Sequence, residues 1–329
     1  MKTKYRFINN GVLIAVALLF FFATGAHAAK YSGEFLELGV SARALGMGGA
    51  FTAVVEDATT AYYNPAALAD IKQKSALFMH TEAFGSLINH DYIGGVLPLR
   101  NRNAGLGFAL MRLGGGDIKL TELSDNPDFA GMNPYHDNIY VVSRIGKHAD
   151  YTGLVSYGMM WKEDISVGVT GKLIYRKLAD ETAFGMGIDL GMKYRMLENL
   201  RFAAVLKDAS ATFLSYSSGA TESIYPGLNL GCAYEMNKSD FDFLLATDTR
   251  IKFEHRDKTA QVSVGGASAD FFLGGEVTFK KRVSGRIGAY RGDLTAGAGL
   301  RLGRFTLDAA YLSHDDLDNS YRINLGGYF

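Results

Sequence analysis

The stretch FGMGIDLGMKY, residues 184–194, alternates strictly between two kinds of side chain. Large apolar residues, from Phe184 to Tyr194, occupy every second position, and glycine, Asp189 or Lys193 occupies each position between them. Successive side chains of a β-strand point to opposite faces, so this pattern gives one large apolar face and one face that is small or charged. The stretch predicts a β-strand.

The same alternation recurs from residue 75 to the end of the chain and predicts an all-β protein of about fourteen strands. The expected strands are 75–84, 91–99, 104–113, 151–161, 164–177, 184–195, 200–208, 224–236, 240–252, 270–280, 284–291, 294–302, 303–312 and 321–329.

The connections between these strands alternate between short polar turns and longer links. The longer links are expected at 114–150, 178–183, 209–223, 253–269 and 313–320. Outer-membrane barrels have short periplasmic turns and long external loops, whereas a soluble sandwich has no reason to separate loop lengths in this way. We therefore predict a transmembrane antiparallel β-barrel, whose even strand number places both barrel ends in the periplasm.

The first 28 residues resemble a secretory signal peptide. Lys2, Lys4 and Arg6 precede an apolar run at 12–23, and Ala26-His27-Ala28 supplies a small-residue cleavage site. The alternative is a membrane anchor, but the apolar run is shorter than the ~20 residues that span a bilayer. We predict a signal peptide at 1–28, an N-terminal segment at 29–74 and a barrel at 75–329.

Composition and motifs argue against several classes of function. The 329 residues carry a formal net charge of zero and no basic block, so nucleic acid is not an expected partner. The only cysteine, Cys232, cannot form an internal disulfide. His314-Asp315-Asp316 is interpreted as an external loop rather than a metal site. We expect no catalytic residues, no metal and no cofactor, and therefore no enzyme.

The final nonapeptide, YRINLGGYF, predicts a closing strand that ends on Phe329. A chain that ends on a strand with a terminal Phe resembles the assembly signal of bacterial outer-membrane barrels. The resemblance implies the barrel-assembly machinery and outer-membrane lipid as partners, and the outer membrane of a Gram-negative-type bacterium as the location.

The stretch SARALGMGGAFTAVVEDATTAYYNPAALA, residues 41–69, resembles the N-terminal signature of the PorV/PorQ family, which is similar to FadL-like long-chain fatty-acid transporters. The resemblance rests on the run at 41–50, the Asp57-Ala58 step and Asn64-Pro65-Ala66. It implies that this segment folds back into the lumen as a plug, although a periplasmic arm is the alternative. The plug residues would be Ser41, Arg43, Gly46, Gly48, Gly49, Asp57, Asn64 and Pro65, with the glycines allowing close approach of the backbone to the wall.

Charged residues of both signs fall on the small or polar faces of the strands. By alternation, the residues that point into the lumen are Lys172, Arg176, Asp189, Lys193, Glu276, Arg286, Arg301, Asp308 and Arg322. Mixed charges favour paired networks or a hydrated interior. We interpret them as groups that hold plug and wall together, and the alternative is a polar path through the barrel.

Resemblance to FadL-like transporters also implies a lateral gate in the third strand, through which apolar ligands leave into the bilayer. Gly114, Gly115 and Gly116 follow the expected strand and are the candidate gate, but they equally suit a flexible lead into the loop. Phe129, Met132 and Tyr135 in that loop are candidates for contact with a ligand, another protein or lipid headgroups.

Three functions remain open. The first is passive transport of a hydrophobic small molecule such as a long-chain fatty acid, for which a continuous apolar pocket would be diagnostic. The alternative is a PorV/PorQ-type component of type IX secretion that handles secreted cargo proteins, for which a long outer loop with a protein-binding face would be diagnostic. The third is a purely structural barrel. The opening motif favours the first.

Overall fold

The computed structural model confirms the predicted β-barrel. It describes residues 33–85, 87–99, 103–123, 140–254, 256, 259–314 and 318–329. The predicted signal peptide at 1–28 lies outside these residues, as do Phe129, Met132, Tyr135, Asp315 and Asp316. Within the described part of the chain, no helix is both long enough and apolar enough to cross a membrane.

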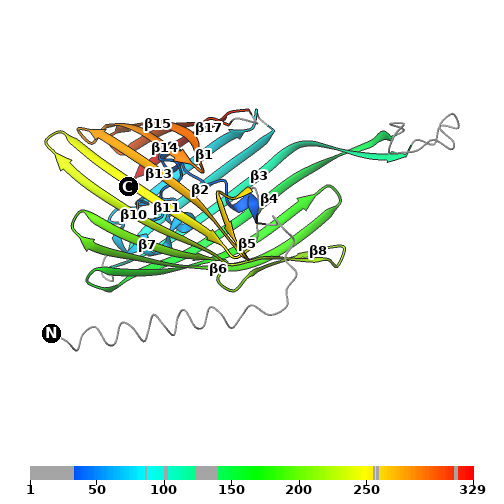
Figure 1. Cartoon of the computed structure of the whole chain (residues 1–329), viewed down its shortest axis with the longest axis horizontal. Helices are drawn as coiled ribbons and strands as arrows, with labels where there is room; N and C mark the ends of the chain where they lie inside the picture. Colours follow the sequence, from blue (N-terminus) through cyan, green and yellow to red (C-terminus); the bar gives the residue numbers. More distant parts are fainter. Residues whose placement is uncertain are drawn as a thin grey trace.

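Fourteen long antiparallel strands form a closed barrel (Figure 1). The last strand pairs with the first from Ser75↔Tyr328 to Glu82↔Tyr321, so no strand edge is left open at the join. The barrel strands are β1 Ser75–Ala83, β2 Ile88–Leu99, β3 Ala104–Leu123, β4 Tyr140–Lys162, β5 Ile165–Leu178, β6 Glu181–Leu197, β7 Leu200–Lys207, β10 Gly227–Lys238, β11 Phe241–Lys252, β13 Ala267–Phe279, β14 Val283–Tyr290, β15 Asp293–Leu302, β16 Phe305–Leu312 and β17 Ser320–Tyr328.

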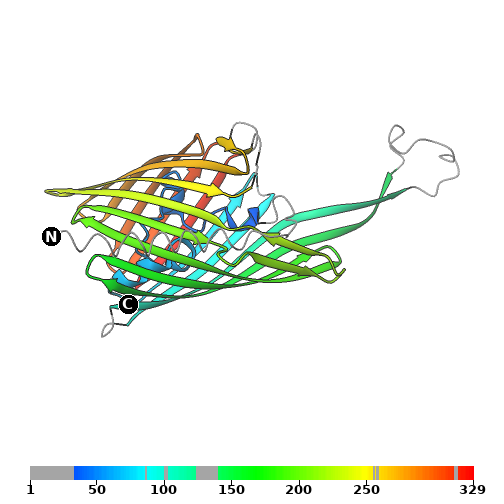
Figure 2. The ribbon, with the colours of Figure 1, turned by 60° about the horizontal axis from the view of Figure 1, so that its bottom comes forward.

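The expected external loop at 114–150 is largely strand, which corrects the sequence interpretation. β3 continues to Leu123 and β4 begins at Tyr140, so the two form a long hairpin that projects beyond the barrel (Figures 1 and 2). The β3–β4 ladder contains register shifts between Gly115 and Ile118 and between Leu120 and Thr121. Each shift breaks the period of two, so the alternation appeared to end at residue 113.

Two other expected loops contain short strands. β8 Thr212–Tyr216 lies within 209–223, β9 Thr221–Ile224 ends one residue beyond that range, and β12 Val262–Val264 lies within 253–269. β8 pairs with the outer part of β6, so β7 and β8 together face one long strand. The break at 208–211 includes two non-glycine residues at positive φ, Asp208 and Ala211, where the backbone leaves the ladder.

The barrel has an apolar outer surface and a polar or small inner surface. On β6, Phe184 and Met186 are 66% and 68% exposed, whereas Asp189 and Lys193, which face inward, are buried. The outward residues form the lipid-facing surface expected of a membrane barrel, which satisfies its backbone hydrogen bonds through closure of the sheet.

The described N-terminal segment, residues 33–74, lies inside the ring of strands (Figure 2). It comprises η1 Glu34–Leu36, α2 Ala42–Gly46, α3 Thr60–Tyr63 and η2 Pro65–Asp70. Its apolar side chains, including the fully buried Met47 and Phe51, pack against inward residues of the wall such as Met111, Leu154 and Phe272. The apolar core of this protein is therefore the contact between this segment and the barrel wall.

Candidate functional site

The N-terminal segment packs on glycines of the wall at two places, which we call seats. The first seat is formed by glycines of β13, β14 and β15. A Cβ at Gly274 would lie 2.2 Å from the carbonyl oxygen of Met47, and one at Gly288 would lie 2.3 Å from the backbone nitrogen of Gly48. Gly48 itself adopts φ +62° and donates its N–H to Thr295 Oγ1 at 3.1 Å. Backbone therefore packs directly on backbone here, which only glycine permits.

The second seat holds the Asn64-Pro65 step against β4, β5 and β6. Cβ atoms added at Gly158 and Gly168 would lie 2.1 and 2.4 Å from the carbonyl group of Pro65, and one at Gly191 would meet Asn64 Oδ1 at 2.4 Å. Asn64 caps η2 because its Oδ1 accepts from the N–H of Ala66, and Pro65 occupies the first position, where a missing N–H costs little.

Polar side chains fix the start of the segment. Ser41 caps α2 by accepting a hydrogen bond from the N–H of Ala44 at 3.3 Å, and Asn324 Oδ1 accepts from the N–H of Ala42 at 3.0 Å. The buried guanidinium of Arg322 donates to the carbonyl oxygens of Leu38 and Ser41. This part of the segment is bonded to β17 through groups about 280 residues away in sequence.

The residue that binds the middle of the segment, Asp248 on β11, was missed by the sequence analysis. Its buried Oδ2 accepts from the backbone N–H groups of Phe51 at 3.0 Å and Thr52 at 2.8 Å, and from the hydroxyl of Thr52. The alternation along β11 could have identified it, because Asp248 lies two and four residues after Ala246 and Leu244 and therefore shares their inward face. A carboxylate in such a position needs donors from another segment.

The expected inward charges form separate networks. Arg43 of the segment binds Glu276 through two hydrogen bonds of 2.7 and 2.9 Å, and Glu276 also accepts from Arg286, which reaches Asp308 at 2.7 Å. This bidentate arrangement ties α2 to β13 through ionised partners, which makes it stronger than neutral hydrogen bonds.

A second network crosses the break between β7 and β8. Lys172 pairs with Asp189 at 2.8 Å and with Asp208, and Lys207 pairs with Asp189 at 3.1 Å while donating to the carbonyl oxygen of Tyr62. Lys207 is another residue that sequence analysis did not select. It links the wall to α3.

The remaining expected lumen residues lie apart from these two networks. Arg176 pairs with Asp150 and lies over the ring of Phe35, and Lys193 pairs with Asp70 of η2 at 2.8 Å. Arg301 is exposed at the short-turn end of the barrel, where it lies over the ring of Tyr328.

Three further residues selected from the sequence, namely Gly49, Asp57 and Phe329, lie outside the two seats and the two charge networks. Gly49, at φ +80°, packs on the rings of Tyr290 and Phe272. Asp57 accepts from the N–H of Thr59 at 2.8 Å, and burial raises its pKa. Phe329 is 68% exposed and donates its N–H to the carbonyl oxygen of Lys74 beside β1.

The candidate gate glycines lie where β3 passes the end of β2. Gly114 and Gly115 still pair with both neighbouring strands, and the Gly116 N–H donates to the carbonyl oxygen of Leu87 at 3.3 Å. The wall is therefore continuous at Gly114 and Gly115, and the register shift begins directly after them.

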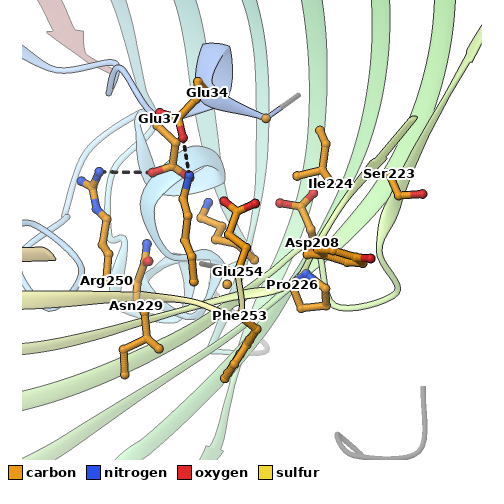
Figure 3. Close-up of a pocket in the computed structure, with 16 residues that line it drawn as sticks. Glu34, Glu37, Asp208, Ser223, Ile224, Pro226, Asn229, Arg250, Phe253 and Glu254 are labelled. Atoms are coloured by element: carbon orange, nitrogen blue, oxygen red, sulfur yellow. Dashed lines mark hydrogen bonds and ion pairs between the residues drawn. The ribbon is translucent and has the colours of Figure 1, made fainter. Parts of the chain in front are cut away.

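At the outer mouth, the end of the barrel opposite the short turns, the beginning of the segment and the wall line a pocket with acid–base pairs (Figure 3). Glu34 accepts from Lys252 at 2.8 Å and Glu37 from Arg250 at 3.4 Å, beside a cavity of about 40 Å³. Burial alone would raise the pKa of Glu37, but the positive charges of Lys252 and Arg250 outweigh it and lower the pKa to about 2. Glu37 is therefore ionised at neutral pH and holds η1 to β11.

The cavities of the lumen are unequal. A second small cavity of about 30 Å³ lies deeper and shares Glu37, Lys207 and Arg250 with the outer one. The largest, about 1170 Å³, opens at the short-turn end and is lined by many charged residues, among them Arg43 and Glu276. Among the described residues, no group of three or more His, Cys, Asp or Glu side chains is arranged to hold a metal ion.

Several solved structures of channels share this fold. The CymD monoaromatic hydrocarbon channel aligns with a TM-score of 0.60 and 12% identity, covering 88% of this chain and 98% of CymD. The Pseudomonas putida toluene transporter TodX gives 0.56 and 12%, with 88% and 96% covered. A Pseudomonas aeruginosa FadL homologue gives 0.52 and 11%, with 88% and 98% covered. At these identities the likeness establishes the fold alone.

No family model and no curated protein matches the chain. The likeness to these solved structures is one of fold, and the FadL-like and PorV/PorQ assignments stay predictions from the motif at 41–69.

Proposed function

We propose that this protein is a FadL-type channel of a Gram-negative outer membrane that carries hydrophobic small molecules passively, without a cofactor. The observation that carries the proposal is the alignment of nearly nine-tenths of the chain with channels named for monoaromatic hydrocarbons and toluene. The apolar outer surface and the closed fourteen-strand wall support the membrane location.

The seated N-terminal segment is proposed to act as the plug. Glycine packing, Asp248 and the Arg43–Glu276 pair all hold it across the lumen. The two outer cavities are small, and the large cavity at the short-turn end is lined by many charged residues, so none of these three cavities is an apolar route from the outer mouth to β3. The structure is therefore interpreted as a closed state, and passage requires movement of the segment or the wall.

We propose Gly114–Gly116 as the lateral exit, supported by the register shift that follows it. Alanine at Gly116 meets no atom within 4 Å, and at Gly115 only atoms beyond 3.5 Å, so Gly115→Ala/Gly116→Ala adds side chains without disturbing packing. Uptake of labelled toluene into cells should fall in this variant. Gly153→Ala on neighbouring β4, which also meets nothing within 4 Å, is the matched control and should leave uptake unchanged. Equal uptake by all three proteins would argue against this exit.

The secretion alternative is supported by one feature, the projecting β3–β4 hairpin. Its outer part carries exposed apolar residues, including Leu123, Val142 and Ile145. Mass spectrometry of everything that co-purifies with the native barrel separates the two functions. A stoichiometric apolar ligand supports transport, whereas secreted proteins that share one C-terminal domain, without ligand, would replace transport by secretion.

A further inference from the structure

The large cavity at the short-turn end of the barrel is lined by basic residues of two kinds. The first kind is paired, with a carboxylate oxygen within 3.3 Å of each side chain: Arg43, Lys193, Arg195, Arg201 and Arg286. The second kind has no ion-pair partner among the residues that the structure describes: Lys72, Lys281, Arg282 and Arg301. Three of these unpaired residues lie together, on the β13–β14 turn and on β15.

Arg282 and Arg301 are neighbours on adjacent strands. The Arg301 N–H donates to the carbonyl oxygen of Arg282 at 2.7 Å, which extends the β14–β15 register by one position beyond Val283↔Leu300. Both side chains line the cavity, and the guanidinium of Arg301 lies 4.8 Å from the ring centroid of Tyr328. Like charges at directly opposite positions of an antiparallel pair are destabilising. An anion between the two guanidinium groups would remove this repulsion.

The carboxylates of the neighbouring wall do not neutralise these two arginines. Asp308 on β16 is bound to Arg286 at 2.7 Å. Asp242 on β11 also lines the cavity, but the whole of β13 lies between it and Arg282, and the two form no ion pair. The positive charge at this corner of the cavity is therefore available to a ligand.

Hydroxyl groups line the same corner. Thr306 of β16 lies directly opposite Arg301, and Ser284 lies two residues after Arg282, on the same inward face. Both hydroxyl side chains line the cavity. Guanidinium groups bind carboxylate and phosphate oxygens through pairs of parallel hydrogen bonds, and hydroxyls can donate one more bond each. These donors and charges suit a ligand with two negative charges carried on oxygen.

Five wall residues form this corner of the cavity, which we call the anion corner: Lys281, Arg282, Ser284, Arg301 and Thr306. We infer that the anion corner binds a small soluble molecule that carries a doubly charged phosphate or two carboxylates. The cavity has a volume of about 1170 Å³ and is bounded by both wall and plug, so it accepts a small molecule but not a folded protein. The inference rests on the proposed outer-membrane location, which opens this end to the periplasm.

Thermal unfolding of the full-length barrel in detergent tests the inference, with anions compared at equal ionic strength. Phosphate and succinate are the doubly charged probes, and acetate and chloride are the singly charged controls. At about pH 7.5, where phosphate is mostly doubly charged, phosphate or succinate should raise the Tm more than acetate or chloride does. In isothermal titration calorimetry, the affinity for that probe should fall at least about tenfold in Arg282→Gln/Arg301→Gln, because both charge-assisted contacts are lost.

A matched variant separates specific binding from a general effect of charge. Lys162→Gln/Lys238→Gln also removes two positive charges at the short-turn end, at the ends of β4 and β10, from residues that do not line the cavity. Its affinity for the probes should equal that of the wild type. Without a probe, Arg282→Gln/Arg301→Gln should be at least as stable as the wild type, because the repulsion is gone, whereas a purely structural role of the two arginines would lower its Tm.

Binding of phosphate alone, or of succinate alone, identifies the chemical class of the ligand and supports the inference. Equal Tm shifts with all four anions, or an unchanged affinity in Arg282→Gln/Arg301→Gln, would overturn it. Toluene uptake is measured independently of anion binding. Loss of anion binding with normal uptake, or the reverse, therefore separates failure of this inference from failure of the proposed function.

Discussion

Gly288 and Gly285 lie three residues apart on β14 and allow a sharp test of how the plug is held. An alanine Cβ at Gly288 would lie 2.3 Å from the backbone nitrogen of Gly48, about 1 Å closer than the 3.4 Å where ordinary contact begins. A Cβ at Gly285 meets nothing within 4 Å. Gly288→Ala therefore pushes the N-terminal segment away from the wall, whereas Gly285→Ala does not.

The cost of Gly288→Ala has two parts. Overpacking against backbone costs about 1–3 kcal/mol, and displacement of Gly48 breaks its hydrogen bond to Thr295, which contributes about 1 kcal/mol. A total of about 2–4 kcal/mol raises the population with a released segment by about 30- to 900-fold. Because the overlap lies between the segment and the wall, the barrel itself should stay folded.

Trypsin cleavage after Arg43 reports release, because this residue is held inside the lumen by Glu276. The rate of cleavage should rise for Gly288→Ala and stay at the wild-type value for Gly285→Ala, with unchanged heat-modifiable mobility for both. Swelling of proteoliposomes in a sugar solution should rise in parallel. If Gly288→Ala behaves like Gly285→Ala in both assays, the glycine seat does not hold the segment.

Three further predictions concern the polar anchors of the segment. The pKa of Glu37 is lowered from 4.5 to about 2, so its ion pairs stabilise the outer mouth fully above about pH 5 and are lost as the pH falls toward 2. Protease sensitivity near η1 should therefore rise as the pH falls over this range. The Glu37→Gln variant should lose this pH dependence. Asp248→Asn keeps the size of the side chain but loses the charged acceptor, which should weaken the attachment of the segment to the wall by about 1–3 kcal/mol. The rate of trypsin cleavage after Arg43 should rise accordingly, whereas Asp242→Asn should leave that rate unchanged. Glu276→Gln leaves the buried guanidinium of Arg286 and the partly buried guanidinium of Arg43 underpaired and should cost about 3–5 kcal/mol of barrel stability in urea unfolding. A change below about 1 kcal/mol would show that the network is hydrated.

The barrel itself could be predicted from local pattern. Alternation of large apolar with small or polar residues depends only on neighbours in the chain, so it gave the fourteen strands and the closing strand that ends near Phe329. It failed in β3 and β4 because the register shifts after Gly115 and Leu120 change the parity. It also missed β8, β9 and β12, which are too short for a period of two to show.

The lumen shows what local pattern cannot provide. Parity indicated that residues such as Glu276 point inward, but its partner Arg43 lies 233 positions away and depends on how the segment enters the barrel. Asp248 and Lys207 were overlooked because their roles depend on backbone groups of the segment, which have no sequence signature. The role of the wall glycines likewise could not be predicted, because it depends on the segment backbone that packs on them in the folded barrel.

Uptake of a hydrophobic compound tests the central claim most directly. Labelled toluene should enter Gram-negative cells that express this protein faster than cells with an empty vector, while uptake of a small sugar stays the same because the plug closes the polar lumen. Equal toluene uptake with and without the folded protein in the outer membrane would contradict the assignment as a channel for hydrophobic small molecules.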